Sequence, residues 1–145
     1  MDPMMIRITQ KEGPVIAGKI WHACLDHPAE FAGVGQLILR MEEICDREGL
    51  VLMEEEPRFL NEGMRRRHYH KRKQQSMEKP ASEPLAFLDD QELHSGKTKV
   101  LLVVNVRSRR NHTMQGTVWG PLTKGMYVGF RSALELMRMI DLIEA

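Results

Sequence analysis

The 145-residue chain is poor in cysteine and in net charge. Small secreted domains held by disulfides usually carry about four cysteines or more, whereas this chain has only Cys24 and Cys45, which indicates a reducing compartment. The formal net charge is +1, so the molecule as a whole has no strong field towards nucleic acid or membrane. Any such attraction must come from a local cluster of charges.

Long apolar runs are also missing. No segment approaches the roughly 18 apolar residues of a membrane-spanning helix, and residues 1–10 lack the apolar core of a signal peptide. Together with the cysteine content, these absences predict a soluble cytoplasmic protein.

Catalytic motifs are absent as well. The chain has no Gly-rich loop ending in Lys-Ser/Thr, no Gly-x-Ser-x-Gly and no His-Glu-x-x-His. Glu42 and Glu43 are neighbours in sequence and face different directions on a helix, so they do not form an acid/base pair. We therefore expect no enzyme and no cofactor.

What the chain does contain is a strand-strand-helix pattern near its start. Residues 5–9 alternate between apolar and polar side chains, and residues 15–24 form a second strand candidate. A helix follows, because apolar residues recur at spacings of three and four, and Gly49 is a plausible stop. Its apolar positions are Val34, Leu37, Ile38, Met41 and Ile44.

The far end repeats this plan. Residues 99–107 are almost continuously apolar, residues 113–119 form the partner strand, and a third short strand could lie at residues 126–128. The last helix has Ser132 as its expected N-cap, with Glu135 three residues later as in a capping box.

The two ends also match each other residue by residue. Gly18 and Trp21 correspond to Gly116 and Trp119, each 98 positions later, and Phe31 corresponds to Phe130, 99 positions later. Two strands and a helix cannot close a core alone, whereas two such units can share one. We predict an α+β protein of two duplicated ββα units, residues 1–51 and 99–145, that form one antiparallel sheet with both helices on one face.

Residues 52–98 are expected to form a charged, extended or partly helical linker. Its basic run could neutralise phosphates without sequence preference, or pair with the acidic residues 54–56 and 89–92. We count as candidate nucleic-acid or partner contacts Arg65, Arg66, Arg67, Tyr69, Lys71, Arg72 and Lys73, together with Arg109 and Arg110 of the second hairpin.

Two further clusters of polar residues are candidates for binding a ligand. Arg107, Gln115 and Arg131 are candidates for holding an anionic group, and the competing interpretation is a solvated turn in which Arg131 pairs with Glu135. His22, Cys24 and His27 form His-x-Cys-x-x-His, but a structural zinc site needs a second close pair, which is missing. The sequence therefore predicts no metal site.

The C-terminal segment carries a resemblance. Residues 111–119 read Asn-His-Thr-Met-Gln-Gly-Thr-Val-Trp, and residues 130–136 read Phe-Arg-Ser-Ala-Leu-Glu-Leu. They resemble uncharacterised small proteins of Firmicutes, chiefly gut clostridia, whose ends read Trp-Gln-Gly-Thr-[Val/Ile]-x-Trp and Phe-Arg-Ser-x-Leu-Glu-Leu. Met114 stands where that family has its first Trp, and Trp119 follows Val118 directly. The resemblance covers about the last 40 residues and implies a bacterial, cytoplasmic origin, but no activity.

These patterns favour a non-enzymatic binding or adaptor protein, a monomer or homodimer, that contacts another macromolecule through the open sheet face, a sheet edge or the linker. The first alternative is a nucleic-acid-associated regulator, such as a mobile-element accessory or inhibitor factor, that acts through the basic linker. The second alternative is a sensor of a small anionic ligand.

Overall fold

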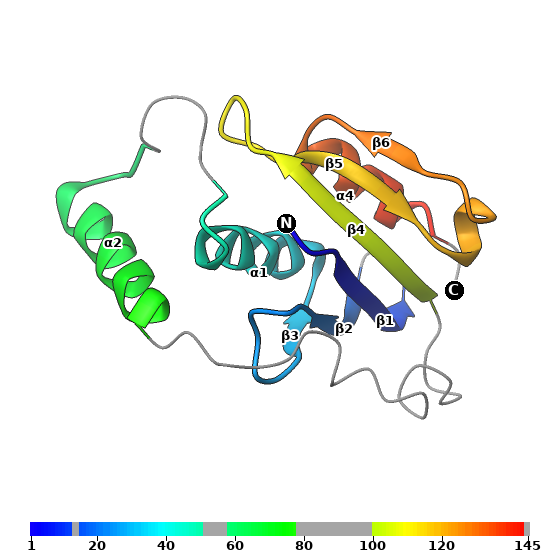
Figure 1. Cartoon of the computed structure of the whole chain (residues 1–145), viewed down its shortest axis with the longest axis horizontal. Helices are drawn as coiled ribbons and strands as arrows, with labels where there is room; N and C mark the ends of the chain where they lie inside the picture. Colours follow the sequence, from blue (N-terminus) through cyan, green and yellow to red (C-terminus); the bar gives the residue numbers. More distant parts are fainter. Residues whose placement is uncertain (13–14, 51–57, 78–99, 144–145) are drawn as a thin grey trace.

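A six-stranded antiparallel sheet with two helices against one face forms the body of the molecule (Figure 1). The computed structural model describes residues 1–12, 15–50, 58–77 and 100–143. The strands are β1 (Met4–Glu12), β2 (Val15–Trp21), β3 (Ala29–Ala32), β4 (Val100–Ser108), β5 (Gln115–Trp119) and β6 (Val128–Phe130). The helices are α1 (Val34–Arg47), α2 (Glu62–Met77), the short 3-10 helix η1 (Pro121–Thr123) and α4 (Ala133–Asp141).

The strand order is β3-β2-β1-β4-β5-β6, so the two halves of the chain meet where β1 pairs with β4. The predicted α+β class and the single antiparallel sheet are confirmed. Each half, however, contributes three strands before its helix. A third strand was predicted only for the second half, at residues 126–128, and it lies at Val128–Phe130. The short β3 has four residues and only one buried side chain, Phe31, which is too little alternation to reveal a strand in the sequence.

The two hairpins share one register. Ile8 pairs with Gly18 in the first hairpin, and Val106 pairs with Gly116 in the second, 98 positions later in each strand. Both ladders then shift by one residue at matching places, after Ile8 and after Val106. A common ancestor of the halves remains a prediction, and this shared register is what such an ancestry requires.

The paired glycines have a specific reason to be glycine. A Cβ on Gly18 would lie 1.9 Å from the carbonyl oxygen of Arg7, and a Cβ on Gly116 would lie 1.9 Å from that of Asn105. The backbones therefore approach so closely that only glycine fits at either position.

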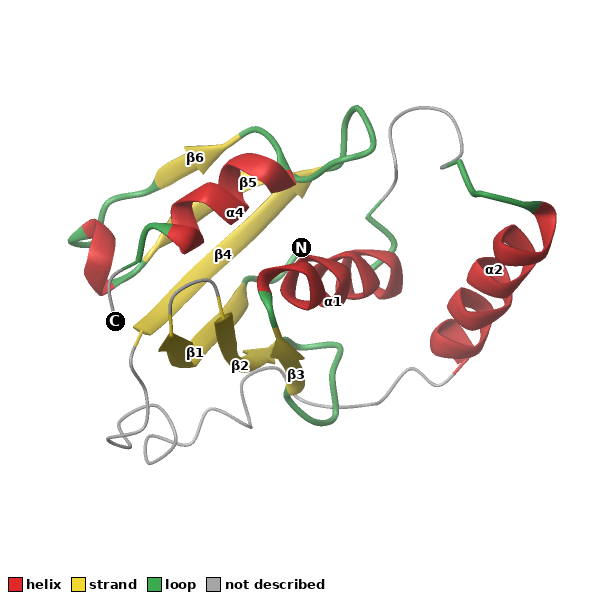
Figure 2. Cartoon of the chain, turned by 180° about the vertical axis from the view of Figure 1, so that it is seen from behind, coloured by secondary structure: helices red, strands yellow, loops and turns green. Residues whose placement is uncertain are grey.

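The core lies between the sheet and its helices. Figure 2 shows α1 and α4 on the same side of the sheet. Alternate residues of β1 and β4 are buried on the face that these helices cover. Each fully buried aliphatic side chain contributes roughly 1.5–3 kcal/mol. The central set, all buried, comprises Met4, Ile6, Ile8, Leu102, Val104 and Val106 of the sheet and Leu37, Met41, Leu136 and Ile140 of the helices.

The helix boundaries agree with the sequence signals. Ser132 is the N-cap of α4, and its Oγ accepts a hydrogen bond from the Glu135 N–H at 3.1 Å. The Glu135 carboxylate accepts from the N–H of Arg131, also at 3.1 Å. In the first half, Gly49 follows the C-cap of α1 with a φ of 73°, which a residue without Cβ adopts readily.

Part of the linker is a helix. Figure 1 shows α2 beside α1 and away from the sheet. The helix lies within residues 52–98, the segment predicted to be extended or partly helical. Residues 51–57 and 78–99, including the acidic residues expected to pair with the basic run, lie outside the described part of the chain.

Candidate functional site

The β6 edge of the sheet exposes a group of large apolar side chains. Leu122 is 55% exposed, Met126 70%, Tyr127 65% and Val128 40%. They follow one another along η1, the turn after it and β6. Tyr127 also packs edge-to-face on Trp119 of β5, with ring centroids 6.2 Å apart. Rigid, exposed apolar groups that gather at a strand edge are typical of surfaces that bind other proteins.

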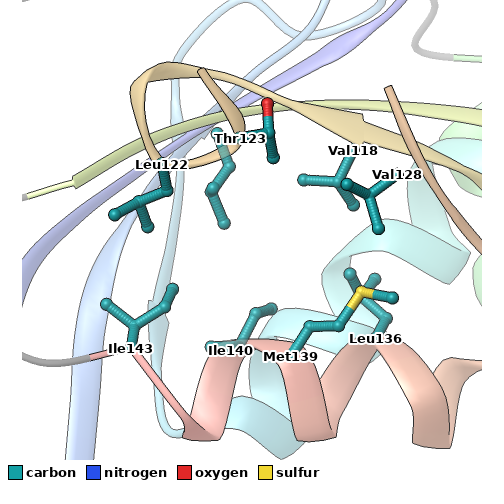
Figure 3. A pocket seen from close by; sticks show the side chains of 9 residues that line it. Val118, Leu122, Thr123, Val128, Leu136, Met139, Ile140 and Ile143 are labelled. Carbon is teal, nitrogen blue, oxygen red and sulfur yellow. The ribbon is translucent and has the colours of Figure 1, made fainter. Parts of the chain in front are cut away.

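An apolar cavity lies directly behind this edge. Its volume is about 140 Å³, and it separates the sheet from α4. Figure 3 shows side chains of β5, β6 and η1 on one side and of the helix on the other, with their ends directed into the space. The lining residues are Leu102, Val118, Leu122, Thr123, Val128, Leu136, Met139, Ile140 and Ile143.

The opposite edge, β3, is closed by side chains of its own helix. The N–H of Ala32 donates to Gln36 Oε1 at 2.9 Å, and Arg40 Nε donates to the carbonyl oxygen of Glu30 at 3.4 Å. Two outward backbone groups of β3, the Ala32 N–H and the Glu30 carbonyl, are therefore bonded within the chain, which discourages the addition of another strand.

The β6 edge has only half of this closure. The N–H of Arg131 is bonded to Glu135, as that of Ala32 is to Gln36. The counterpart of Arg40, 99 positions later, is Met139, whose side chain has no hydrogen-bond donor. Gly129 is the counterpart of Glu30, 99 positions later. Because backbone groups alternate between the two sides of a strand, its N–H and carbonyl point away from β5, as those of Glu30 point away from β2. Gly129 also has no side chain to shield them.

The predicted basic run lies on α2. Arg65 and Arg66 reach Glu62 at 3.3 and 3.7 Å, and the Arg66 side chain remains 81% exposed. The Tyr69 ring contacts those of Phe59 and His68 and lies under the Arg65 guanidinium, 5.4 Å from it, so one face is already occupied. Arg67 is also on this helix; Lys71, Arg72 and Lys73 belong to it by their backbone, and their side chains are outside the described part.

Arg109, a predicted surface contact, is instead 1% exposed. Its Nη1 lies 3.0 Å from Glu42 Oε2 and 2.9 Å from Asp46 Oδ1, and its Nη2 donates to the carbonyl oxygen of Leu50. Burial alone would lower the pKa of Arg109, but bonds to Asp46 and Glu42 outweigh it and the pKa is raised. The charge ties the second hairpin to α1 and is not presented to a ligand. Its neighbour Arg110 is exposed.

The three residues expected to hold an anion do not converge. Gln115 Nε2 donates to the carbonyl oxygens of Arg110, Thr113 and Arg131, which uses the amide to fix the turn. Arg131 pairs with Glu135 at 3.3 Å, which is the ion pair that the competing interpretation of the sequence predicted. Arg107 lines a separate open hollow on the sheet with Asn105 and Tyr127.

A buried polar cluster lies between β2 and the end of α1. His22 Nε2 lies 3.1 Å from the carbonyl oxygen of Asp2, His22 Nδ1 accepts the Cys24 N–H at 3.1 Å, and Glu48 Oε1 lies 3.8 Å from Nδ1. Burial lowers the pKa of His22, and burial followed by the Glu48 charge raises the pKa of the Cys24 thiol to about 11. A thiol held protonated is a poor nucleophile, so the cluster does not resemble a Cys–His catalytic pair.

Comparison with family models gives no match for this chain, and comparisons with curated proteins and with solved structures give none either. Among the described helices, none combines the length and the apolar character needed to cross a membrane.

The sequence did not point to the cavity. Leu122 lies in a stretch with Gly-Pro and Lys-Gly turn signals, and the third short strand predicted at residues 126–128 did not show that Val128 lines a space beside the last helix. A signal was present in the three consecutive apolar residues Met126, Tyr127 and Val128 at the end of this turn-rich segment.

Proposed function

We propose that the chain is a non-enzymatic binding protein that adds an extended segment of another protein to β6 and takes one apolar side chain of that segment into the cavity. The observation that carries the proposal is the position of the apolar cavity immediately behind an exposed apolar strand edge. Strand addition of this kind draws affinity from main-chain hydrogen bonds and specificity from pockets for side chains.

The dimensions of the cavity suit one apolar side chain. A space of about 140 Å³ is close to that of an apolar cavity known to hold a benzene-sized molecule, roughly 150 Å³. Transfer of a Leu, Ile or Met side chain from water into such a place contributes about 1.5–3 kcal/mol. The backbone of Gly129 supplies a donor and an acceptor beside it, so apolar and main-chain contacts act together.

The symmetry of the two halves supplies the control for an experiment. Gly129→Pro removes the outward N–H of β6, and Glu30→Pro makes the same change at the matching position of β3. Proline is tolerated at an outward position of an edge strand, so both variants are expected to fold, which circular dichroism checks. The predicted pattern is a dominant partner, captured from the native cell, that is retained by the wild type and Glu30→Pro and lost by Gly129→Pro.

A partner retained equally by both variants would rule out the β6 edge, and so would the failure of the wild type to retain any partner. Tyr127→Ala and Met126→Ser, which leave the backbone unchanged, separate side-chain contacts from strand pairing. Each is expected to weaken binding about tenfold if the exposed apolar group takes part.

A second candidate, nucleic-acid binding through α2, is favoured by the exposure of Arg66 on a helix that also carries Arg65 and Arg67. Contacts of this kind go to phosphates and carry no sequence preference. For either function, we propose that the protein acts in the cytoplasm of a bacterium.

A further inference from the structure

The turn after β2 and the C-terminal end of α1 bring three potential ligands of a metal ion together. His22 and Cys24 lie in one turn, closed by a hydrogen bond from the Leu25 N–H to the His22 carbonyl oxygen at 3.1 Å. Glu48 is the C-cap of α1. The ligand atoms of His22, Cys24 and Glu48 all lie within 4.8 Å of one another. Tetrahedral zinc bonds of about 2.0–2.3 Å hold ligand atoms roughly 3.3–3.8 Å apart, so the three atoms must close by about 1 Å at their widest separation.

The surroundings of His22 orient the ring in the way metal sites require. The carbonyl oxygen of Asp2, 3.1 Å from Nε2, needs a donor and so fixes the proton on Nε2. The lone pair is then on Nδ1, the nitrogen that faces Glu48. A histidine that ligates a metal usually donates its other N–H to a carboxylate or a backbone carbonyl. The His22 side chain is fully buried, which keeps this orientation.

We propose that His22 Nδ1, the Cys24 sulfur and the Glu48 carboxylate bind one zinc-like divalent cation, with a fourth position left for water or an outside ligand. Nitrogen and sulfur donors favour zinc over magnesium and calcium, which prefer oxygen ligands. A thiolate and a carboxylate together also balance the two positive charges of the ion. The Cys24 N–H, now bonded to Nδ1, must turn aside when the ion takes the lone pair.

The matching place in the second half has lost these groups. Gly120 and Leu122 stand 98 positions after His22 and Cys24, and Leu122 lines the apolar cavity. One half therefore holds a polar cluster where the other holds an apolar space. The fold of the second half forms without these polar groups, so the fold alone does not require His22 and Cys24 in the first half.

Binding is coupled to pH in a defined direction. The ion needs Cys24 as a thiolate and His22 neutral. The Cys24 thiol therefore releases its proton when it binds the ion. Affinity should rise with pH, by up to about tenfold per unit as long as the thiol of the metal-free chain is protonated, with one proton released per ion.

The experiment titrates the full chain, stripped with a chelator and kept reduced with a phosphine, with Zn²⁺ against a chromophoric chelator. One Zn²⁺ per chain is expected. Glu48→Gln should weaken binding at least tenfold, because even loss of a group outside the first ligand sphere costs about 10- to 100-fold. Titration with Co²⁺ should give a thiolate-to-metal absorption band that Cys24→Ser removes. His27→Gln, a nearby histidine outside the cluster, serves as the control and should bind as the wild type does.

The proposal is overturned if the wild type binds no stoichiometric Zn²⁺, or if Glu48→Gln and Cys24→Ser both bind as tightly as the wild type. Should Cys24→Ser fail to fold, Glu48→Gln decides alone, since its side chain is partly exposed and its loss leaves the core intact.

Discussion

Replacement of Arg109 by Met tests how the second hairpin is held to α1. Arg109 is buried, and its guanidinium contacts Glu42, Asp46 and the carbonyl oxygen of Leu50. Removal of one partner of a buried ion pair typically costs about 3–5 kcal/mol, because the other charges lose their compensation. The Asp46 side chain is 13% exposed and that of Glu42 31%, so water takes over part of the lost interaction. We therefore expect a loss near the lower limit, about 3 kcal/mol.

Urea unfolding followed by circular dichroism measures this loss directly. About 3 kcal/mol corresponds to a decrease in Tm of roughly 10 °C for a chain of this size. Arg107→Met, an exposed arginine two residues earlier, is the matched control and should stay within about 0.5 kcal/mol of the wild type. A change at Arg109 no larger than that of the control would refute the anchoring role.

Three further predictions concern pH, packing and charge. Because burial lowers the pKa of folded His22 below 6.5, the stability it contributes is present above pH 6.5 and is lost as the pH falls below that value; urea unfolding at pH 7.5 and 5.0 should show this loss in the wild type and His27→Gln but not in His22→Gln. Gly116→Ala should destabilise the protein by about 3 kcal/mol through its clash with Asn105, whereas Gly35→Ala, in open space on α1, should stabilise it by about 0.5–1 kcal/mol, both by thermal unfolding. If α2 binds nucleic acid, affinity for random-sequence DNA or RNA should fall steeply with salt and vanish when its six basic residues become Ser; binding unchanged in that variant would exclude the helix.

The strands and helix faces of both halves follow from the sequence because their signals are local. Alternation in β1, the apolar spacing of α1 and the cap at Ser132 each involve residues within a few positions of one another. The third strand of the first half was missed for the same reason. Its four residues carry almost no pattern, and it exists because β2 offers an edge and α1 supplies Gln36 and Arg40 to hold it.

The candidate sites depend on contacts that no local pattern records. Arg109 was predicted to contact nucleic acid or a partner from the second hairpin, and only the packing of α1 brings Glu42 and Asp46, more than 60 positions away, to it. Glu48 joins His22 and Cys24 from about 25 residues away in the chain, so the two close ligand pairs typical of a structural zinc site do not appear in the sequence. The cavity lies between the sheet and α4, so its presence depends on how these elements pack and not on a local sequence pattern.

Amide hydrogen exchange with the captured partner tests the binding proposal most directly. The N–H of Gly129 should exchange more slowly in the complex than in the free chain, because a strand added to β6 bonds it, while the N–H of Glu30 at the other edge should exchange at the same rate in both. A complex in which Gly129 exchanges as fast as in the free chain would contradict strand addition at β6.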